Sequence, residues 1–509
     1  MKYFHTGSGR PEAVCVVTAI CYFGLYCVVA LTLLFCQPFG NPPDEYNRYL
    51  IPQFIAENGT LPTGFEEEVR IEGYGSSYAF HPILPYIFQG YLMRLAGLFT
   101  QDSQALLLTA RLVNFFFGLV MAVFVLLLGH LWFQDRRFAW LFAFLVTFWP
   151  QGIFLHTYVN TDSCCMMSIA MILYGLTWGL QKGFGPAASI LLSLGIILCA
   201  LSYYNAYGFI LSSILLFTAS FLSWEKGRRP VFQWKPFLKT GGMISLVVLL
   251  GIGWWFIRNL LLYEGDLLGM AARERFATLH ALPQYQPALR ASWLNLGYSA
   301  WDMLRDSDFI TLTRQSFICS YGAMNITTSI WIYRFYRVLV AVGVLCSLLI
   351  PLRYTWKVSG ILERKERVCR ESRTKTQAGM GAGKGLTRFF HGNMVFCIAM
   401  PYLLSVIFSY TTDYQPQGRY VLPALVPLCY YVVHGLEKLL LLEPGKLPGF
   451  LGRAGRQWAG KHTVPAGSRK KEGIPTAVVI TLSALVAFFL LWTVWGYALP
   501  YYAANPVAP

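Results

Sequence analysis

Long apolar stretches constrain what this chain can fold into more than any other feature of its sequence. They have from 17 to 28 residues, about the length that a helix needs to cross a bilayer core of about 30 Å. A chain inside the bilayer must satisfy its own backbone polar groups, so such stretches predict helices. We therefore expect an all-α, polytopic transmembrane bundle with about eleven spans. The expected spans are 14–36, 105–132, 137–155, 163–181, 187–203, 205–223, 240–262, 332–353, 392–411, 419–441 and 475–498.

The composition also indicates a membrane protein. Hydrophobic residues make up 55% of the 509 residues and charged residues 13%, whereas soluble domains carry roughly 25% charged residues. The net charge of +16 lies mostly between the apolar stretches, which is typical of a multispan protein and not of a nucleic-acid-binding stripe. We expect the lipid bilayer as a partner and no nucleic acid. The twelve cysteines include no CxxC pair, so the sequence indicates neither a zinc site nor a disulfide framework.

The basic segments predict the orientation. Lys and Arg gather in 354–391 and 442–474, and basic residues near span ends favour the cytoplasmic side. The stretch 14–36 is too long for a signal-peptide core and is expected as a retained span that starts inside. Phe80–Phe99 is then expected as an amphipathic helix along the membrane surface, because counting it as a span would reverse the basic segments. The expected external segments are 37–104, 160–162, 263–331 and 411–419.

Three carboxylates occur beside span ends on the expected external side. Asp44 and Glu45 follow the first span, and Asp162 precedes the span 163–181. Loss of hydration at a membrane edge raises the pKa of a carboxylate, which suits a general base. An ordinary role fits as well, because Asp44 and Asp162 are placed to cap the helices that follow them.

Three basic side chains on the same expected side are candidates for binding a substrate phosphate. His81 lies in the first external segment, Arg258 near the external end of the span 240–262, and Arg419 at the start of the span 419–441. A guanidinium suits phosphate because its planar fork makes paired hydrogen bonds to the oxygens. Each of the three also fits a simple anchor at the membrane interface.

These pieces, in this order, resemble the GT-C superfamily of membrane glycosyltransferases. The matching pieces are Pro43-Asp44-Glu45, His81-Pro82, Asp162, Arg258-Asn259 with Tyr263-Glu264-Gly265-Asp266, and Gln417-Gly418-Arg419-Tyr420. The chain departs from the family's frequent His-Pro-Pro at Ile83 and from its Tyr-Gly-Asp at Glu264. The resemblance implies a GT-C-like catalytic module over 1–441, a basic cytoplasmic loop at 442–474, and a last span with an external tail at 475–509.

The resemblance also implies an activity. The donor would be a polyprenyl-phosphate-linked sugar, and the acceptor a glycan, a lipid or a protein. The active site would face the outside of a bacterial plasma membrane, and an in-line displacement would invert the anomeric centre. Such a donor is already activated, which agrees with the lack of a P-loop or other nucleotide-binding motif in the sequence.

Residue roles follow from the same resemblance. Asp44 would be the general base or an acid that orients the acceptor, with Glu45 beside it, and Asp162 would position the acceptor or a metal. The substrate-binding residues would be His81, Arg258 and Arg419. The resemblance establishes no cofactor and leaves a divalent cation, Mg²⁺ or Mn²⁺, open.

Three other classes stay open from the sequence. A lipid-linked glycan ligase or polymerase would use a diphosphate-linked donor and need more than one external arginine. A transporter or flippase would need ionisable residues near the bilayer centre and paired repeats. A non-catalytic membrane scaffold would not need carboxylates gathered on one side.

Overall fold

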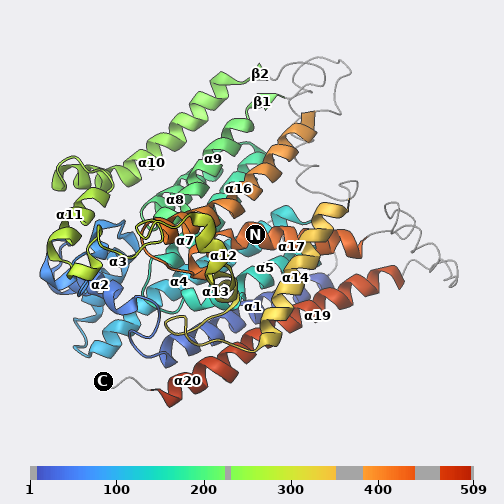
Figure 1. The fold of residues 1–509 in the computed structure, drawn as a ribbon. Coiled ribbons are helices and arrows are strands. Elements are labelled where there is room, and N and C mark those ends of the chain that lie inside the picture. Colours follow the sequence, from blue (N-terminus) through green and yellow to red (C-terminus); the bar gives the residue numbers. More distant parts are fainter. Residues whose placement is uncertain (1–8, 224–230, 351–381, 442–469, 506–509) are drawn as a thin grey trace.

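The computed structural model describes residues 9–223, 231–350, 382–441 and 470–505. Nearly all the regular structure in these ranges is helical, which confirms the predicted all-α class. The strands within them, β1 (Leu222–Ser223) and β2 (Val231–Phe232), form one short antiparallel pair. The architecture is therefore a helical bundle, as Figure 1 shows.

Eight helical segments in the described ranges are long and apolar enough to cross a membrane. The first five are α1 (Gly9–Cys36), α4 (Ser103–Trp132), α7 (Asp162–Lys182), α10 (Trp234–Leu262) and α14 (Ile330–Leu349). The others are α16 (Ala382–Thr411), η5 (Gly418–Ala424) with α17 (Leu425–Leu440), and α19 (Lys470–Thr493) with η7 (Val494–Ala498) and α20 (Leu499–Ala504). Two shorter apolar helices are α8 (Pro186–Ala200) and α9 (Tyr207–Ala219), the latter preceded by η3 (Tyr204–Ala206). The total of eleven spans stays a prediction.

The expected span 137–155 contains two helices and not one. Helix α5 (Arg136–Thr147) ends at Phe148, and α6 (Pro150–Leu155) begins two residues later. Pro150 lacks a backbone N–H and pushes the residue before it out of the helical region, so the helix is interrupted there. Trp149 fills the break with a buried indole that donates a hydrogen bond to the Phe317 carbonyl at 2.6 Å.

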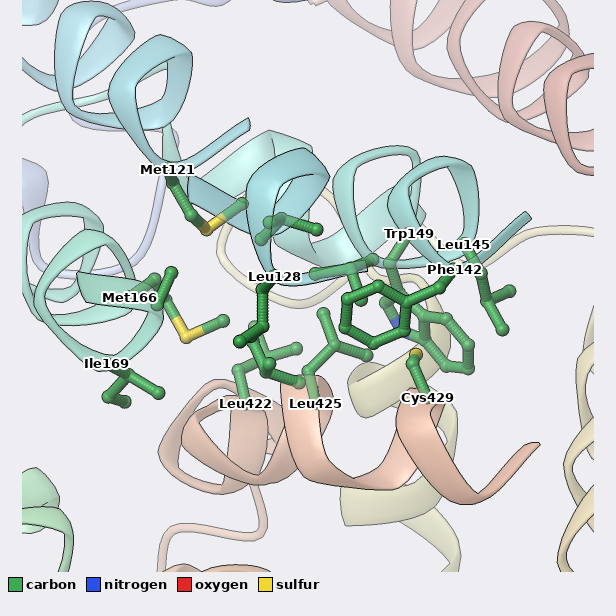
Figure 2. Packing of buried hydrophobic residues seen from close by; sticks show 14 of the residues in the cluster. Met121, Leu128, Phe142, Leu145, Trp149, Met166, Ile169, Leu422, Leu425 and Cys429 are labelled. Atoms are coloured by element: carbon green, nitrogen blue, oxygen red, sulfur yellow. The ribbon is translucent and has the colours of Figure 1, made fainter. Parts of the chain in front are cut away.

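The core of the bundle lies around α7 and α17, which are almost entirely buried. A helix that is apolar on all sides buries every face, so these two helices occupy the centre. Between α14 and α17 the backbones approach closely, because a Cβ on Gly435 would lie 1.8 Å from the Gly343 carbonyl oxygen. Figure 2 shows part of the hydrophobic core around α7 and α17. The labelled side chains are Met121, Leu128, Phe142, Leu145, Trp149, Met166, Ile169, Leu422, Leu425 and Cys429.

The segment 37–104 forms a small helical layer at one end of the bundle (Figure 1). Its elements are α2 (Glu45–Asn58), η1 (Glu67–Val69), η2 (Tyr78–Phe80) and α3 (Leu84–Ala96). One face of α3 is buried through Tyr86, Gln89 and Met93, and the other exposes Phe88, Leu92 and Leu95. The stretch predicted as a one-sided helix is thus helical over Leu84–Ala96, and its position on a membrane surface stays a prediction.

The segment 263–331 covers the same end of the bundle. It contains α11 (Met270–His280), η4 (Pro283–Tyr285), α12 (Ala300–Asp306) and α13 (Phe309–Ile318). It contacts the segment 37–104 tightly at Gly75, where φ is +60° and a Cβ would lie 2.3 Å from the Ala281 nitrogen. The Leu282 N–H also donates to the Gly73 carbonyl at 2.9 Å. The two segments therefore form one structure over the end of the bundle.

Candidate active site

A polar cavity of about 330 Å³ lies where the two end segments meet the bundle. Its walls come from α2, the stretch 71–86, the turn 202–205, α11 with residue 290, and residues 405–420. The charged residues in its lining are Asp44, Asp413, Arg48, Arg273 and Arg290, and the tyrosines are Tyr74, Tyr78, Tyr86, Tyr203, Tyr204 and Tyr420. Such a mixture of aromatic rings and a few converging polar groups is typical of a small-molecule site.

Asp44 presents its carboxylate to this cavity. Its backbone is left-handed, with φ of +60°, a conformation that Asp tolerates better than most residues. Although Asp44 directly precedes α2, its side chain makes no capping hydrogen bond to that helix. The side chain is 36% exposed, so it is accessible from the cavity.

Arg419 forms an ion pair with the Asp44 carboxylate from outside the cavity lining. Its Nη2 lies 2.5 Å from Asp44 Oδ2 and donates to the Tyr420 hydroxyl at 2.9 Å, while its Nη1 donates to the Pro43 carbonyl at 3.3 Å. Arg419 is 1% exposed and does not line the cavity. The residue before it, Gly418, packs against the Phe317 backbone, where a Cβ would lie 1.9 Å from the nitrogen. Arg419 is thus placed to position Asp44 and does not reach a ligand in the cavity.

The pKa of Asp44 is low, which corrects the expectation of a raised value. Burial alone would raise the pKa of this carboxyl, but the positive charges of Arg419 and Arg48 outweigh it and lower the pKa to about 2. Asp44 is therefore ionised at any physiological pH, and it can accept a hydrogen bond without first losing a proton.

Asp162 contributes through Arg48. Its Oδ2 accepts a hydrogen bond from Arg48 Nη1 at 2.9 Å, and Arg48 Nη2 lies 3.8 Å from Asp44 Oδ2. The Asp162 side chain is buried and is not part of the cavity lining. It is the first residue of α7, and Thr161 occupies the N-cap position. With Arg419, these side chains form a row of alternating charge, which runs from Asp162 through Arg48 and Asp44 to Arg419.

Glu45 faces away from the cavity, although it follows Asp44 directly. It is 0% exposed, and its oxygens accept hydrogen bonds from Arg111 at 2.6 and 2.8 Å and from the Val159 N–H at 3.0 Å. Arg111 also donates to the carbonyls of Leu34 and Gln37. Glu45 therefore ties α2 to α4 and to the turn before α7, and its environment does not suit the catalytic role expected for it.

His81 lines the cavity as a neutral side chain. Burial, with the nearby charges of Arg273 and Arg48, lowers the pKa of His81 well below its ordinary value. Its ring lies 5.6 Å from that of Tyr204. His81 can therefore form a hydrogen bond to a ligand but brings no positive charge to a phosphate near neutral pH.

Arg258 lies elsewhere. Its Nη2 donates to the Pro62 carbonyl at 2.7 Å, and its guanidinium lies 5.1 Å from the centre of the Trp255 ring. It is absent from the cavity lining. Arg258 thus links α10 to the segment 37–104, and the structure does not bring it together with Asp44.

Two cavity arginines had no motif in the sequence to identify them. Arg273 donates to Ser76 Oγ at 3.2 Å, and Arg290 lies 5.9 Å from the centre of the Tyr74 ring. Within the described residues neither makes an ion pair with a carboxylate. Burial and the charge of Arg290 lower the pKa of Arg273. An anion bound between them would offset that unfavourable burial of positive charge.

The residues of the site do not fit a protein-held metal. In the part of the chain that the structure describes, no three His, Cys, Asp or Glu side chains are close enough to hold an ion. Asp44 and Asp162 each have a guanidinium partner already.

The fold and the site define an integral membrane protein with a polar cavity at one end of its helical bundle. No family model and no curated protein matches the chain by sequence. Among solved structures it is similar to the archaeal oligosaccharyltransferase AglB from Archaeoglobus fulgidus, in complex with an inhibitory peptide and a dolichol-phosphate. That match has 11% sequence identity and a TM-score of 0.44, and covers 92% of this chain and 55% of that one.

A second similar structure is ArnT from Cupriavidus metallidurans bound to undecaprenyl phosphate. It has 13% identity and a TM-score of 0.38, and the match covers 94% of this chain and 70% of that one. Both proteins are membrane glycosyltransferases of the GT-C superfamily, which the sequence motifs resemble. The chain spans little more than half the length of the oligosaccharyltransferase.

Proposed function

We propose that this protein is a membrane glycosyltransferase that moves a sugar from a polyprenyl-phosphate carrier to an acceptor hydroxyl in the cavity. The observation that carries the proposal is the Asp44 carboxylate, which shares the cavity with Arg273 and Arg290. Such a transfer needs an ionised group that accepts a proton and positive charges that are free to bind phosphate. Asp44 is the first, and the two arginines, which have no carboxylate partner among the described residues, are the second. In the predicted orientation, the cavity faces the outside of the membrane.

The two cavity arginines would bind the donor phosphate. They take this role in place of Arg258 and Arg419, which are engaged elsewhere. Negative charge on the phosphate grows as the bond to the sugar breaks, so fixed positive charges stabilise the transition state more than the ground state. His81, neutral and in the same lining, would add a hydrogen bond.

The sugar would lie among the tyrosines of the lining. Tyr78, Tyr203 and Tyr204 offer flat apolar faces beside hydroxyl groups, which together match a sugar's C–H faces and hydroxyls. The same walls would hold the acceptor hydroxyl behind the anomeric carbon, so that positioning contributes to the rate.

In the reaction, the acceptor oxygen bonds to the anomeric carbon as the bond from that carbon to the phosphate oxygen breaks. The phosphate leaves with the bonding electron pair, and the acceptor proton passes to Asp44 and then to water. A low pKa suits this order of events. An acceptor oxygen that is already bonding to a positively charged carbon loses its proton readily, so a weak base close by is sufficient.

A second candidate is a lipid-linked glycan ligase with a diphosphate-linked donor. The observation that favours it is the pair Arg273 and Arg290, because one guanidinium could hold each phosphate. The two functions differ in the lipid that they release, which is polyprenyl phosphate in one case and polyprenyl diphosphate in the other.

The test uses the purified full chain in nanodiscs with a panel of polyprenyl-phosphate and polyprenyl-diphosphate sugars. Membrane and glycan extracts supply acceptors, and the released lipid is identified by mass spectrometry. We expect release of polyprenyl phosphate from at least one hexose or pentose donor, with the sugar found on an acceptor. Release of the diphosphate would favour the ligase, and no consumption of any donor would contradict both.

A further inference from the structure

A second hollow of about 500 Å³ lies on the opposite part of the bundle from the catalytic cavity, between α9 and the first turns of α16. It is lined by Leu215, Gly385, Arg388, Phe389, Gly392, Asn393 and Phe396, which we call the α9–α16 groove. Leu215 and Phe389 are 41% and 36% exposed. The groove is thus an apolar depression on the outer surface of a membrane-length helix.

One buried side chain in the groove, Asn393, has a polar atom without a hydrogen-bond partner among the described residues. Asn393 is 5% exposed, and its amide nitrogen donates to Ser212 Oγ at 2.8 Å. Its Oδ1 has no partner among the described residues. If the amide turned by 180°, the Ser212 hydroxyl would donate to the oxygen and the nitrogen would take the unpartnered position. In either orientation one polar atom of this buried side chain has no partner among the described residues, and such atoms are rare in buried places.

A positive charge lies at the end of the groove nearest the start of α16. Arg388 is exposed and forms no ion pair with the described residues. It precedes Asn393 by five residues, which is about 7.5 Å along a helix. Between them, Gly392 leaves the floor open, because a Cβ there would meet no atom within 4 Å.

We propose that the α9–α16 groove binds a phospholipid with a net negative charge. The lipid phosphate would pair with Arg388 at the interface, and an acyl chain would lie over Gly392. With the Asn393 amide turned so that its nitrogen is the unpartnered atom, that nitrogen would donate a hydrogen bond to one ester carbonyl. The ester groups of a phospholipid lie deeper in the bilayer than its phosphate, in the order in which Asn393 follows Arg388. This charge match also distinguishes an anionic lipid from a zwitterionic one, whose own ammonium neutralises the phosphate.

Two variants test the groove, each with a matched control. Arg388→Gln removes the charge, and Arg334→Gln removes that of an exposed arginine on α14. Gly392→Leu adds a side chain in the groove at a position where a Cβ meets no other atom, and Gly253→Leu does the same at an equally open position on α10. Unfolding temperatures of all four should match that of the unmodified chain, so a loss of binding would not reflect misfolding.

The measurement is native mass spectrometry of the full chain in detergent, titrated with dioleoyl phosphatidylglycerol or dioleoyl phosphatidylcholine. We expect the unmodified chain and both controls to bind phosphatidylglycerol more tightly than phosphatidylcholine. Arg388→Gln and Gly392→Leu should bind phosphatidylglycerol about ten- to a hundredfold more weakly. Inorganic phosphate should not displace the lipid, because it has no acyl chain for the groove. Equal affinity in Arg388→Gln and Arg334→Gln, or equal affinity for the two lipids, would overturn the proposal.

Discussion

Asp44 Oδ2 lies 2.5 Å from Arg419 Nη2, although the two residues are 375 positions apart in the chain. The contact joins the start of α2 to the start of η5. Because Arg419 is buried and Asp44 is accessible, only the Asp44 side of the pair can contact a ligand. The carboxylate meets the ligand, and the guanidinium fixes its position and keeps it ionised.

The first prediction concerns Arg419→Lys. Lysine keeps the charge but cannot donate at once to Asp44, Pro43 and Tyr420, so Asp44 would lose its fixed position. We expect kcat to fall about ten- to a hundredfold with little change in the donor KM. Steady-state kinetics over a range of donor concentrations measures both. A raised KM with an unchanged kcat would instead place Arg419 on the donor.

The second prediction concerns pH. The pKa of Asp44 is about 2 in the folded protein, below the ordinary value of an aspartate. The carboxylate is therefore fully ionised at the ordinary pKa of an aspartate and above it, and it takes up a proton only as the pH falls toward 2. The rate of the unmodified enzyme should therefore show no acid limb from Asp44 between pH 5 and pH 7. In Arg419→Gln the positive charge that most lowers the pKa of Asp44 is gone. Burial then raises this pKa, so the pH at which the rate falls on the acid side should move toward neutral. Identical pH–rate profiles would contradict this account.

The third prediction concerns the donor phosphate. Arg273→Gln and Arg290→Gln each remove a guanidinium from the cavity. Each should raise the donor KM about ten- to a hundredfold, because a charge-assisted hydrogen bond to phosphate is lost. Arg305→Gln is the control, since Arg305 is exposed on α12 and paired with Asp306. Donor binding measured directly should change in the same way, and a result like that of Arg305→Gln would exclude the arginine tested from the site.

The fourth prediction separates Glu45 from Asp44. The Glu45–Arg111 pair is fully buried, and removing one member leaves the other charge without a partner. Glu45→Gln should lower the free energy of unfolding by about 3–5 kcal/mol, as measured by denaturant titration in detergent. The surviving folded fraction should keep most of its turnover. Normal stability with abolished turnover would return Glu45 to a catalytic role.

The sequence was sufficient for the fold class and for part of the site. Span-length apolar stretches predict helices because the bilayer leaves few alternatives, and Asp44 and Arg419 were both singled out by their place at span ends. Their contact was not predictable, since it depends on how α2 and η5 pack. Glu45 resembled Asp44 in sequence, but the left-handed backbone at Asp44 directs the two side chains to different neighbours.

Other parts of the site had no detectable pattern. Arg273 and Arg290 lie in the segment 263–331, which has no apolar period to fix their direction, and tertiary contacts such as Gly75 with Ala281 place them in the cavity. Arg111 could have been noticed, because a charge inside the apolar stretch 105–132 needs a buried partner. The low pKa of Asp44 escaped prediction because it depends on how closely Arg419 and Arg48 approach the carboxylate in the folded chain.

The central claim is that the Asp44 carboxylate accepts the proton of the acceptor hydroxyl during sugar transfer. The substitution Asp44→Asn tests this claim most directly. Asn keeps the size and a hydrogen-bonding oxygen but removes the base. The control is Asp102→Asn, which changes an exposed N-cap of α4, where Asn serves nearly as well. The measurement is a single turnover in nanodiscs with donor already bound. The account predicts that Asp44→Asn binds donor normally but transfers sugar at least about a hundredfold more slowly than Asp102→Asn. Equal rates for the two variants would contradict it.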